Sequence, residues 1–373
     1  MSKTSKSRAD AAARRRVRME EIEKRRAARK RRRRQKNIRR LLLIGALALL
    51  LYMGVRLIQN GADKDRQPPE AANGQTETAP EKTNEEEATE VAAETEPDGT
   101  KETINWSFNE NLARRRIQSE VALLYSVDTD EVLYEKNADL ITYPASLTKM
   151  MTQIVAVEHL TPAMLDEEVM LSEEIYWEMV AEEASMSGFK PGEIVTMRDM
   201  LYANFIASAG DASETIAIEV AGSEADFVAL MNEKAAELGM QDTVFKNPTG
   251  LHDPEHETTA NDLLKLYQYA SRNVEFMKYF TADHYTTQPK DGSEGLELRP
   301  RLWEDLQDSG MPYRVLGGKT GFTEEAGLCL ITLIERSGYR FLVISMGAPY
   351  DVSFTTDLED HIWIMRGLSR NPQ

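Results

Sequence analysis

The longest run of apolar residues in the chain covers positions 41–58 and reads LLLIGALALLLYMGVRLI, with Arg56 as its single charged residue. A helix needs about 20 predominantly apolar residues to cross a bilayer, so this run predicts a transmembrane anchor. Arg56 lies near one end, from which a basic side chain can reach the headgroups. Because about forty residues precede the run and no small-x-small cleavage pattern follows it, an uncleaved anchor is favoured over a cleavable signal peptide.

Residues 59–102 contain almost no large apolar side chain and are rich in Glu, Thr, Ala, Asn and Pro. Such a segment cannot bury enough apolar surface to offset the entropy lost on ordering it. We therefore predict a disordered acidic linker here. Residues 103–373 are long enough, and apolar enough, to form one sizeable core.

Apolar runs predict strands near both ends of this last region. Residues 121–127 and 131–135 flank the turn sequence Asp128-Thr129-Asp130, which predicts a β-hairpin. Residues 328–334 and 340–346, joined through Ser337-Gly338, predict two further strands.

Helices are predicted between these strands and after them. Three pairs place Ser or Thr three positions before an acidic residue, the pattern of a capping box at a helix start: Thr196 with Asp199, Ser223 with Asp226, and Thr259 with Asp262. The predicted helices cover 146–160, 196–207, 223–239, the residues from 259 onward, and 355–368. We therefore predict an α+β fold in which both ends of the domain complete one antiparallel sheet, flanked by helices and carrying an inserted helical lobe.

Charge separates the two ends of the chain. Residues 1–40 contain 19 basic and 4 acidic residues, a net charge of +15, whereas the remainder contains 26 basic and 58 acidic residues, a net charge of −32. Basic residues beside a transmembrane helix mark its cytoplasmic side and attract anionic lipid headgroups. Although an arginine-rich tail is also typical of nucleic-acid binding, its position against the anchor favours the membrane lipids, and we expect no nucleic-acid partner.

Cysteine and histidine give little sign of a metal site or a disulfide. Cys329 is the single cysteine and falls in an apolar run, so we expect a buried thiol. The segment His252–His256 offers metal-ligand side chains at close spacing, but Pro254 disfavours the helix that would bring both imidazoles to one face. We therefore expect no metal.

Candidate chemistry lies in three short motifs, beginning with Ser146 and Lys149. Their spacing puts both side chains on one face of a helix at its first turn. A serine hydroxyl becomes a good nucleophile when a nearby base takes its proton. Lys149 is such a base only when neutral, so its pKa must be lowered by burial or by a second cation, for which Lys319 is the candidate. The Ser146 N–H, at a helix start, is available to a developing oxyanion.

The second and third motifs are Ser208-Ala209-Gly210 and Lys319-Thr320-Gly321. Ser208 follows a predicted helix, from which its hydroxyl can pass a proton to a leaving amine. Lys319 and Thr320 can bind a terminal carboxylate. Gly321 permits a close backbone approach, and the N–H of Phe322 can complete an oxyanion hole. Together these residues predict acyl transfer by an active-site serine.

Around these motifs, residues 104–350 resemble the low-molecular-mass penicillin-binding serine D-alanyl-D-alanine carboxypeptidases. The resemblance is carried by YPASLTKMMT, PGEIVTMRDMLYA, FVALMNEKAAELGM, NPTGLHD and GGKTGFTEEAGLCL. It implies a β-lactamase/DD-peptidase-like fold, with no metal or organic cofactor. The implied substrate is the D-Ala-D-Ala end of a peptidoglycan stem peptide, and β-lactam antibiotics are the implied covalent inhibitors.

The resemblance also implies a role for each motif residue. Ser146 is the acyl-enzyme nucleophile, Lys149 the base and Ser208 a proton relay. The substrate-binding residues are Lys319, Thr320, Gly321, Phe322 and Gly210. At position 210 the chain departs from the family, which usually has Asn there, and the lost amide contact would cost about 1–3 kcal/mol in the transition state.

We therefore predict a single-pass protein of a bacterial cell membrane. It has a basic cytoplasmic tail (1–40), a transmembrane anchor (41–58), a disordered linker (59–102) and an extracytoplasmic catalytic domain (103–373).

Two other functions remain open. A β-lactamase needs a base for fast deacylation, for which Glu233 and Glu237 are available. A non-enzymatic wall-binding protein would follow if Gly210 disabled the site. The sequence leaves open whether water or an amine attacks the acyl-enzyme.

Overall fold

The computed structural model describes residues 106–370, except 289, 291, 293, 301–312 and 352. The predicted tail, anchor and linker at 1–40, 41–58 and 59–102 lie outside the described residues. Within the described ranges, no helix is both long enough and apolar enough to cross a membrane.

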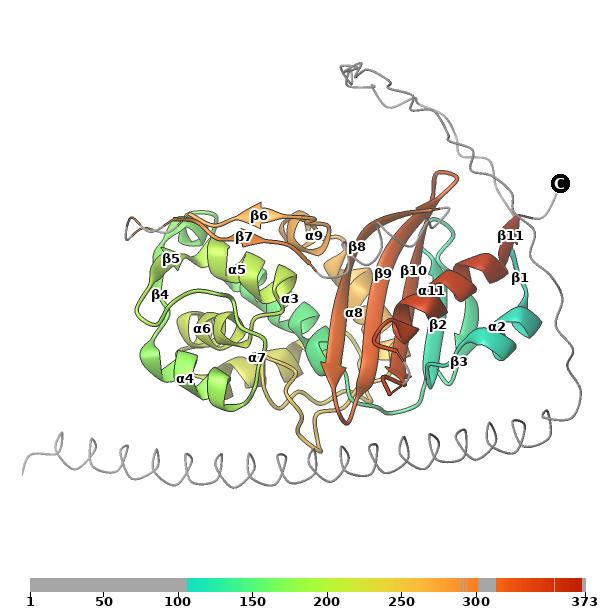
Figure 1. The fold of residues 1–373 in the computed structure, drawn as a ribbon, viewed down its shortest axis with the longest axis horizontal. Helices are drawn as coiled ribbons and strands as arrows, with labels where there is room; N and C mark the ends of the chain where they lie inside the picture. The colour runs from blue at the N-terminus through green and yellow to red at the C-terminus, as the bar shows by residue number, and fades with distance from the viewer. Residues whose placement is uncertain are drawn as a thin grey trace, which may run out of the picture. The chain divides into compact units, whose positions relative to one another are not determined.

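A five-stranded antiparallel sheet forms one part of the described molecule (Figure 1). Its order is β3-β2-β10-β9-β8. The strands are β2 (Val121–Ser126), β3 (Glu131–Lys136), β8 (Arg314–Thr323), β9 (Gly327–Arg336) and β10 (Tyr339–Ala348). The predicted hairpin is confirmed, because β2 pairs with β3 around the expected turn. Since β2 also pairs with β10, strands from both ends of the domain complete the sheet, as predicted.

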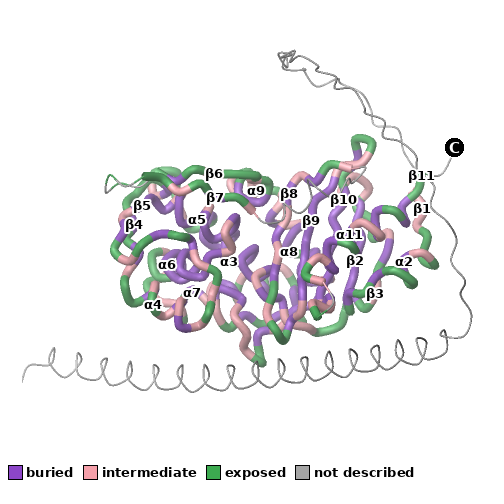
Figure 2. Tube along the Cα trace, in the orientation of Figure 1, coloured by how far each residue is buried: buried purple, intermediate pink, exposed green. Residues whose placement is uncertain are grey.

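Alternation along the strands builds two cores, one on each face of the sheet. In β2, Val121 and Leu123 belong to the larger core, whereas Ala122 and Leu124 belong to the smaller one. The smaller core is covered by α2 (Glu110–Arg116) and α11 (Thr356–Gly367), and beside it β1 (Trp106–Phe108) pairs with β11 (Leu368–Arg370) (Figure 1). The larger core continues into the helical lobe, so the central strands are buried on both faces (Figure 2).

The helical lobe is inserted between β3 and β8, as predicted. Its helices are α3 (Lys149–His159), α4 (Glu173–Ala181), α5 (Met197–Ile206), α6 (Gly210–Ala221), α7 (Glu224–Glu237), α8 (Ala260–Ala270) and α9 (Val274–Phe280). The lobe also contains two short strand pairs: β4 (Glu168–Met170) with β5 (Ile194–Thr196), and β6 (Tyr285–Thr286) with β7 (Glu297–Leu298). The sequence patterns predicted α3, α5, α7, α8 and α11 but not α2, α4, α6 or α9.

The predicted capping boxes are realised to different degrees. The box of Thr196 and Asp199 is complete at the start of α5. At the start of α8, the Thr259 hydroxyl accepts from the Asp262 N–H, but the Asp262 carboxylate turns to other donors, the Asp242 N–H and the Thr243 hydroxyl. Ser223 likewise caps α7 without the reciprocal bond to its own backbone N–H.

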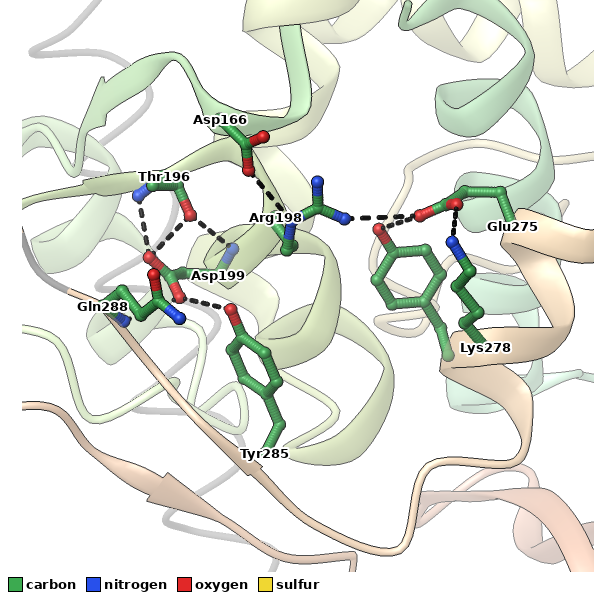
Figure 3. Close-up of polar contacts among 9 residues, drawn as sticks. Asp166, Thr196, Arg198, Asp199, Glu275, Lys278, Tyr285 and Gln288 are labelled. Carbon is green, nitrogen blue, oxygen red and sulfur yellow. Dashed lines mark hydrogen bonds and ion pairs between the residues drawn. The ribbon is translucent and has the colours of Figure 1, made fainter. Parts of the chain in front are cut away.

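The buried carboxylate of Asp199 connects α5 to the segment that contains β6 (Figure 3). One of its oxygens accepts from the N–H and hydroxyl of Thr196, and the other accepts from the Tyr285 hydroxyl at 2.9 Å and the Gln288 N–H at 3.0 Å. A buried carboxylate costs much less when it is hydrogen-bonded on all sides. This network holds α5, whose C-terminal end leads to Ser208.

A second link from α5 runs through Arg198 (Figure 3). Its guanidinium donates to Asp166 at 3.0 Å and pairs with Glu275 of α9 at 3.6 Å. Because planar guanidinium groups bridge carboxylates well, Arg198 ties α9 to the start of α5.

Candidate functional site

Ser146 lies in the short 3-10 helix η1 (Ala145–Thr148), directly before α3. The residue before it, Ala145, has a φ of 47°, a left-handed conformation that costs free energy for a non-glycine residue. Gly250 approaches so closely that a Cβ there would lie 1.9 Å from the Ala145 carbonyl oxygen. The backbone before the predicted nucleophile is therefore held against the loop that contains Gly250.

Lys149 is the first residue of α3, and its side chain is buried against Ser146. The Lys149 Nζ lies 3.2 Å from the Ser146 Oγ and also donates to the carbonyl oxygen of Thr249. The predicted juxtaposition of these two side chains is present. Burial lowers the pKa of Lys149 to about 7, against an opposing effect of the carboxylates of Asp211 and Glu214. Of the two causes that the sequence suggested, burial and a second cation, burial is the main one.

Ser208 lies in the turn between α5 and α6, with a φ of 55°. Its hydroxyl oxygen accepts a hydrogen bond from the Lys319 Nζ at 2.9 Å. The fold thus brings together residues 111 positions apart. The predicted position of Ser208, just after a helix, is confirmed.

Lys319 is buried in β8, where its ammonium also donates to the Thr320 carbonyl oxygen at 2.9 Å. Burial, followed by the nearby charge of Lys149, holds the pKa of Lys319 well below its usual range. The whole motif Lys319-Thr320-Gly321 lies inside β8.

The β8 strand forms one edge of the sheet in its described part. A Cβ on Gly321 would lie 3.0 Å from the Ser146 backbone nitrogen, so the two predicted binding elements are in close contact. Phe322 follows, with 40% of its surface exposed. An edge strand offers backbone donors and acceptors to an extended peptide. The arrangement can therefore hold a peptide along β8 beside Ser146.

Gly210 is the first residue of α6, and its N–H donates to the Ser185 carbonyl oxygen at 2.7 Å. A Cβ at this position would lie 2.9 Å from the Ala184 Cβ and 3.1 Å from the Met179 Sδ. These distances are shorter than ordinary contacts, so residues 184 and 185 occupy the space beside Gly210. The surrounding residues therefore leave no space for a side chain at position 210.

The neighbouring Asp211 does not replace the missing amide. Its two carboxylate oxygens accept from the Ser187 N–H at 2.9 Å and the Ser187 hydroxyl at 2.5 Å. Burial raises the pKa of Asp211, and these hydrogen bonds partly oppose that rise. Asp211 thus anchors residues 184–187 over the start of α6.

The sequence interpretation assigned no role to Asn247 or Thr249, which form part of the site. The Asn247 amide oxygen accepts from the N–H groups of Thr249 and Gly250, at 3.2 and 2.8 Å. This turn aims the Thr249 carbonyl at Lys149. The Asn-Pro-Thr-Gly sequence signals a turn, but nothing local shows what the turn contacts.

His256 lies behind the predicted nucleophile and supports its backbone. Its Nε2 donates to the Thr148 hydroxyl at 2.9 Å, and that hydroxyl donates to the Ala145 carbonyl at 2.7 Å. Burial lowers the pKa of His256 to about 4, so the ring is neutral. No three His, Cys, Asp or Glu side chains are arranged to hold a metal in the part of the chain that the structure describes. Cys329 is buried as expected, which raises its thiol pKa to about 12.

Comparisons with known proteins agree with this arrangement. A family model for D-alanyl-D-alanine carboxypeptidases matches residues 108–350. A D-alanyl-D-alanine carboxypeptidase of Bacillus subtilis (strain 168) is 34% identical over 236 residues, which cover 62% of this chain and 58% of that relative. A D-alanyl-D-alanine endopeptidase of Pseudomonas aeruginosa is 30% identical over 243 residues, which cover 64% and 74%. The chain thus spans little more than half the length of the first relative.

Among solved structures, the DD-transpeptidase of Streptomyces K15 is similar, with a TM-score of 0.60 and 26% sequence identity. The match covers 67% of this chain and 96% of that protein. A D-alanyl-D-alanine carboxypeptidase from Mycobacterium tuberculosis has the same fold, with a TM-score of 0.58, 24% identity and coverage of 69% and 93%. The predicted DD-peptidase-like α+β fold is confirmed for residues that the structure describes.

Proposed function

Because this chain belongs to the D-alanyl-D-alanine carboxypeptidase family, we propose that it removes the terminal D-alanine from peptidoglycan stem peptides through an acyl-enzyme on Ser146. The observation that carries the proposal is the pairing of Ser146 with the buried Lys149 at 3.2 Å. A second pair, Ser208 with Lys319 at 2.9 Å, supports it. Nucleophile, base and proton relay are then all supplied by side chains of the chain itself.

Acylation begins with neutral Lys149, which accepts the proton of the Ser146 hydroxyl as its Oγ attacks the carbonyl carbon between the two D-alanines. The N–H groups of Ser146 and Phe322 stabilise the resulting oxyanion. The C–N bond then breaks, and Ser208 passes a proton to the departing amine of D-alanine. Water attacks the ester, releasing the shortened peptide and restoring the Ser146 hydroxyl.

Substrate recognition is assigned to β8. Lys319 and Thr320 bind the terminal carboxylate by hydrogen bonding. Gly321 allows the substrate backbone to approach Ser146, and Gly210 contributes no side chain to the site. β-Lactam antibiotics carry a carboxylate beside a strained amide, so we expect them to acylate Ser146 as covalent inhibitors.

We also infer where the protein acts. Residues 41–58 anchor it in the bacterial cell membrane, and residues 1–40 remain in the cytoplasm against anionic lipids. Residues 59–102 separate the anchor from the catalytic domain at 103–373, which faces the cell wall. Protease protection of right-side-out and inverted vesicles, read with antibodies to each end, tests this topology.

A β-lactamase is the nearer rival, and two observations favour the carboxypeptidase. Glu233 is exposed, and Glu237 forms an ion pair with Lys234 at 2.6 Å, so neither glutamate resembles a poised deacylation base. Without such a base a penicilloyl ester should persist. A wall-binding protein without activity is the more distant rival, and it predicts no covalent adduct.

The test is the intact mass of the full chain, purified in detergent, after brief incubation with benzylpenicillin and again after removal of the drug. We expect a lasting adduct on the wild type and none on Ser146→Ala. D-Alanine release from a stem pentapeptide, measured in parallel, must also vanish in Ser146→Ala. An adduct that is lost within seconds would favour the β-lactamase, and release unaffected by the substitution would sink the proposed mechanism.

A further inference from the structure

His256 and Thr148 form a buried pair behind the segment that carries Ser146. Their side chains come from positions 108 apart in the chain, and the residues are 3% and 1% exposed. The imidazole Nε2 lies 2.9 Å from the Thr148 hydroxyl oxygen. The acyl-transfer steps proposed above use neither side chain, so the pair has no role in them so far.

Hydrogen-bond partners on both sides fix the direction of this pair. The Lys246 N–H donates to the His256 Nδ1 at 3.4 Å, so the ring proton lies on Nε2. The Nε2–H donates to the Thr148 hydroxyl, whose single proton goes to the Ala145 carbonyl oxygen at 2.7 Å. Phe245 holds the ring by an edge contact, with centroids 5.6 Å apart. One chain of donors therefore runs from the Lys246 backbone to the Ala145 carbonyl.

The backbone around the Ala145 carbonyl explains why this donor matters. Ala145 has a φ of 47°, a left-handed conformation that persists only when the surrounding structure holds it. The N–H of Lys149, which would bond this carbonyl in a regular α-helix, donates to the carbonyls of Ser146 and Leu147. The Thr148 hydroxyl supplies a donor in its place. A side chain thus helps to hold the strained backbone directly before Ser146.

The peptide between Ala145 and Ser146 carries a functional group at each end. Because a peptide unit is planar, the Ala145 carbonyl and the Ser146 N–H turn together. That N–H is the proposed donor to the oxyanion, and the Oγ of the same residue lies 3.2 Å from the Lys149 Nζ. An oxyanion donor lowers the barrier only when it is already aimed at the developing charge. Rotation of this peptide would therefore weaken the transition state more than the binding of intact substrate.

We propose, resting on the proposed function, that His256 is a positioning residue for acylation. Through Thr148, it holds the peptide between Ala145 and Ser146 in the orientation at which the Ser146 N–H faces the oxyanion. His256 itself touches neither the substrate nor the reacting atoms. Its contribution is to the rate of ester formation rather than to the binding of the intact substrate.

The test is acylation of the full chain by benzylpenicillin in stopped flow, which separates the rate constant of ester formation from the affinity of the first complex. His256→Leu should lower the rate constant about tenfold and change the affinity less than about twofold. His256→Gln, whose amide N–H can replace the Nε2–H, should recover the rate to within about threefold of the wild type. Thr148→Val should behave like His256→Leu, whereas Thr148→Ser, which keeps the hydroxyl, should acylate like His256→Gln.

His361 of α11 supplies a matched control. It is 1% exposed, and its Nδ1 lies 2.8 Å from the Thr332 hydroxyl oxygen, so the two residues form a second buried pair of the same kind. His361→Leu should lower the free energy of unfolding about as much as His256→Leu but leave the acylation rate unchanged. The inference is overturned if His256→Leu acylates like the wild type, or if His361→Leu slows acylation equally.

A readout that needs no activity separates this inference from the proposed function. Protein labelled with ¹³C at the alanine carbonyl and ¹⁵N at the serine amide gives NMR signals only for serines that follow alanine, and Ser146→Ala identifies the Ser146 signal. His256→Leu should move this signal, and His256→Gln, which also lacks the ring, should return it toward the wild-type position. If His256→Leu does not fold, Thr148→Val and Thr148→Ser are compared in the same way.

The two readouts fail independently. If the wild type neither forms an adduct nor releases D-alanine, but the Ser146 signal responds as expected, the proposed function fails and the support of this peptide by His256 stands. A Ser146 signal at the same position in His256→Leu and His256→Gln overturns the inference even in an active carboxypeptidase.

Discussion

Replacing Gly210 by asparagine would introduce the side chain that the resemblance expects, yet the structure predicts no gain from it. The new Cβ would lie 2.9 Å from the Ala184 Cβ and 3.1 Å from the Met179 Sδ. Met179 can rotate away because its side chain is flexible. Ala184 cannot, since its Cβ moves only with the backbone. The segment over the start of α6 must therefore shift before an asparagine fits.

The cost follows from overpacking a buried site, which is worth about 1–3 kcal/mol. Removing a glycine restricts the unfolded chain and returns about 0.4–1 kcal/mol. We expect Gly210→Asn to lower the free energy of unfolding by about 1–2 kcal/mol, a clear shift in a urea unfolding midpoint. The rate of Ser146 acylation by benzylpenicillin should not rise, because Ser185 and its neighbours would be displaced within the site.

Two further variants separate sterics from amide chemistry. Gly210→Ala adds the same Cβ without an amide and should lose a similar amount of stability. Ala184→Gly removes the nearest atom, so the double variant Gly210→Asn/Ala184→Gly should recover stability relative to the sum of the single changes. The reasoning is refuted if Gly210→Asn is as stable as the wild type and acylates at least tenfold faster while Gly210→Ala does not.

Four other outcomes are expected. The rate of acylation by benzylpenicillin should rise with pH through about 7 and then level off, because Lys149 accepts a proton only when neutral and burial lowers its pKa to that value; a stopped-flow profile flat from pH 5 to 9 would contradict this. The free energy of unfolding should also increase as the pH rises from 7 to 10, because in this range Lys149 binds more protons in the unfolded chain than in the folded one. Gly250→Ala should abolish acylation and lower the melting temperature, because its Cβ would fall 1.9 Å from the Ala145 carbonyl oxygen; normal acylation would disprove the close approach. Asp199→Ala should lower the free energy of unfolding, measured in urea, by about 3 kcal/mol, because the Tyr285 hydroxyl and the Gln288 N–H lose their acceptor. A decrease of less than about 1 kcal/mol would argue against the network.

Local patterns were sufficient where the structure depends on neighbours in the sequence. The hairpin around Asp128-Thr129-Asp130 follows from turn residues between two apolar runs. The complete capping box of Thr196 and Asp199 follows from their spacing of three. The contact between Ser146 and Lys149 follows from one turn of helix. Helices α2, α4, α6 and α9 were not predicted, because none of them begins with Ser or Thr three positions before an acidic residue.

Tertiary structure decided what depends on residues far apart in the chain. The acceptor of Lys149 is a carbonyl 100 positions away, and desolvation by burial lowers its pKa. The partner of Lys319 is 111 positions away. The sequence alone was enough to propose which side chains carry the chemistry, because residue types and short spacings point to them. Only the tertiary structure decided how closely the loops pack around Gly210 and Ser146, and how far Lys149 is buried from water. The reason is that burial depends on the whole folded chain rather than on neighbours in the sequence.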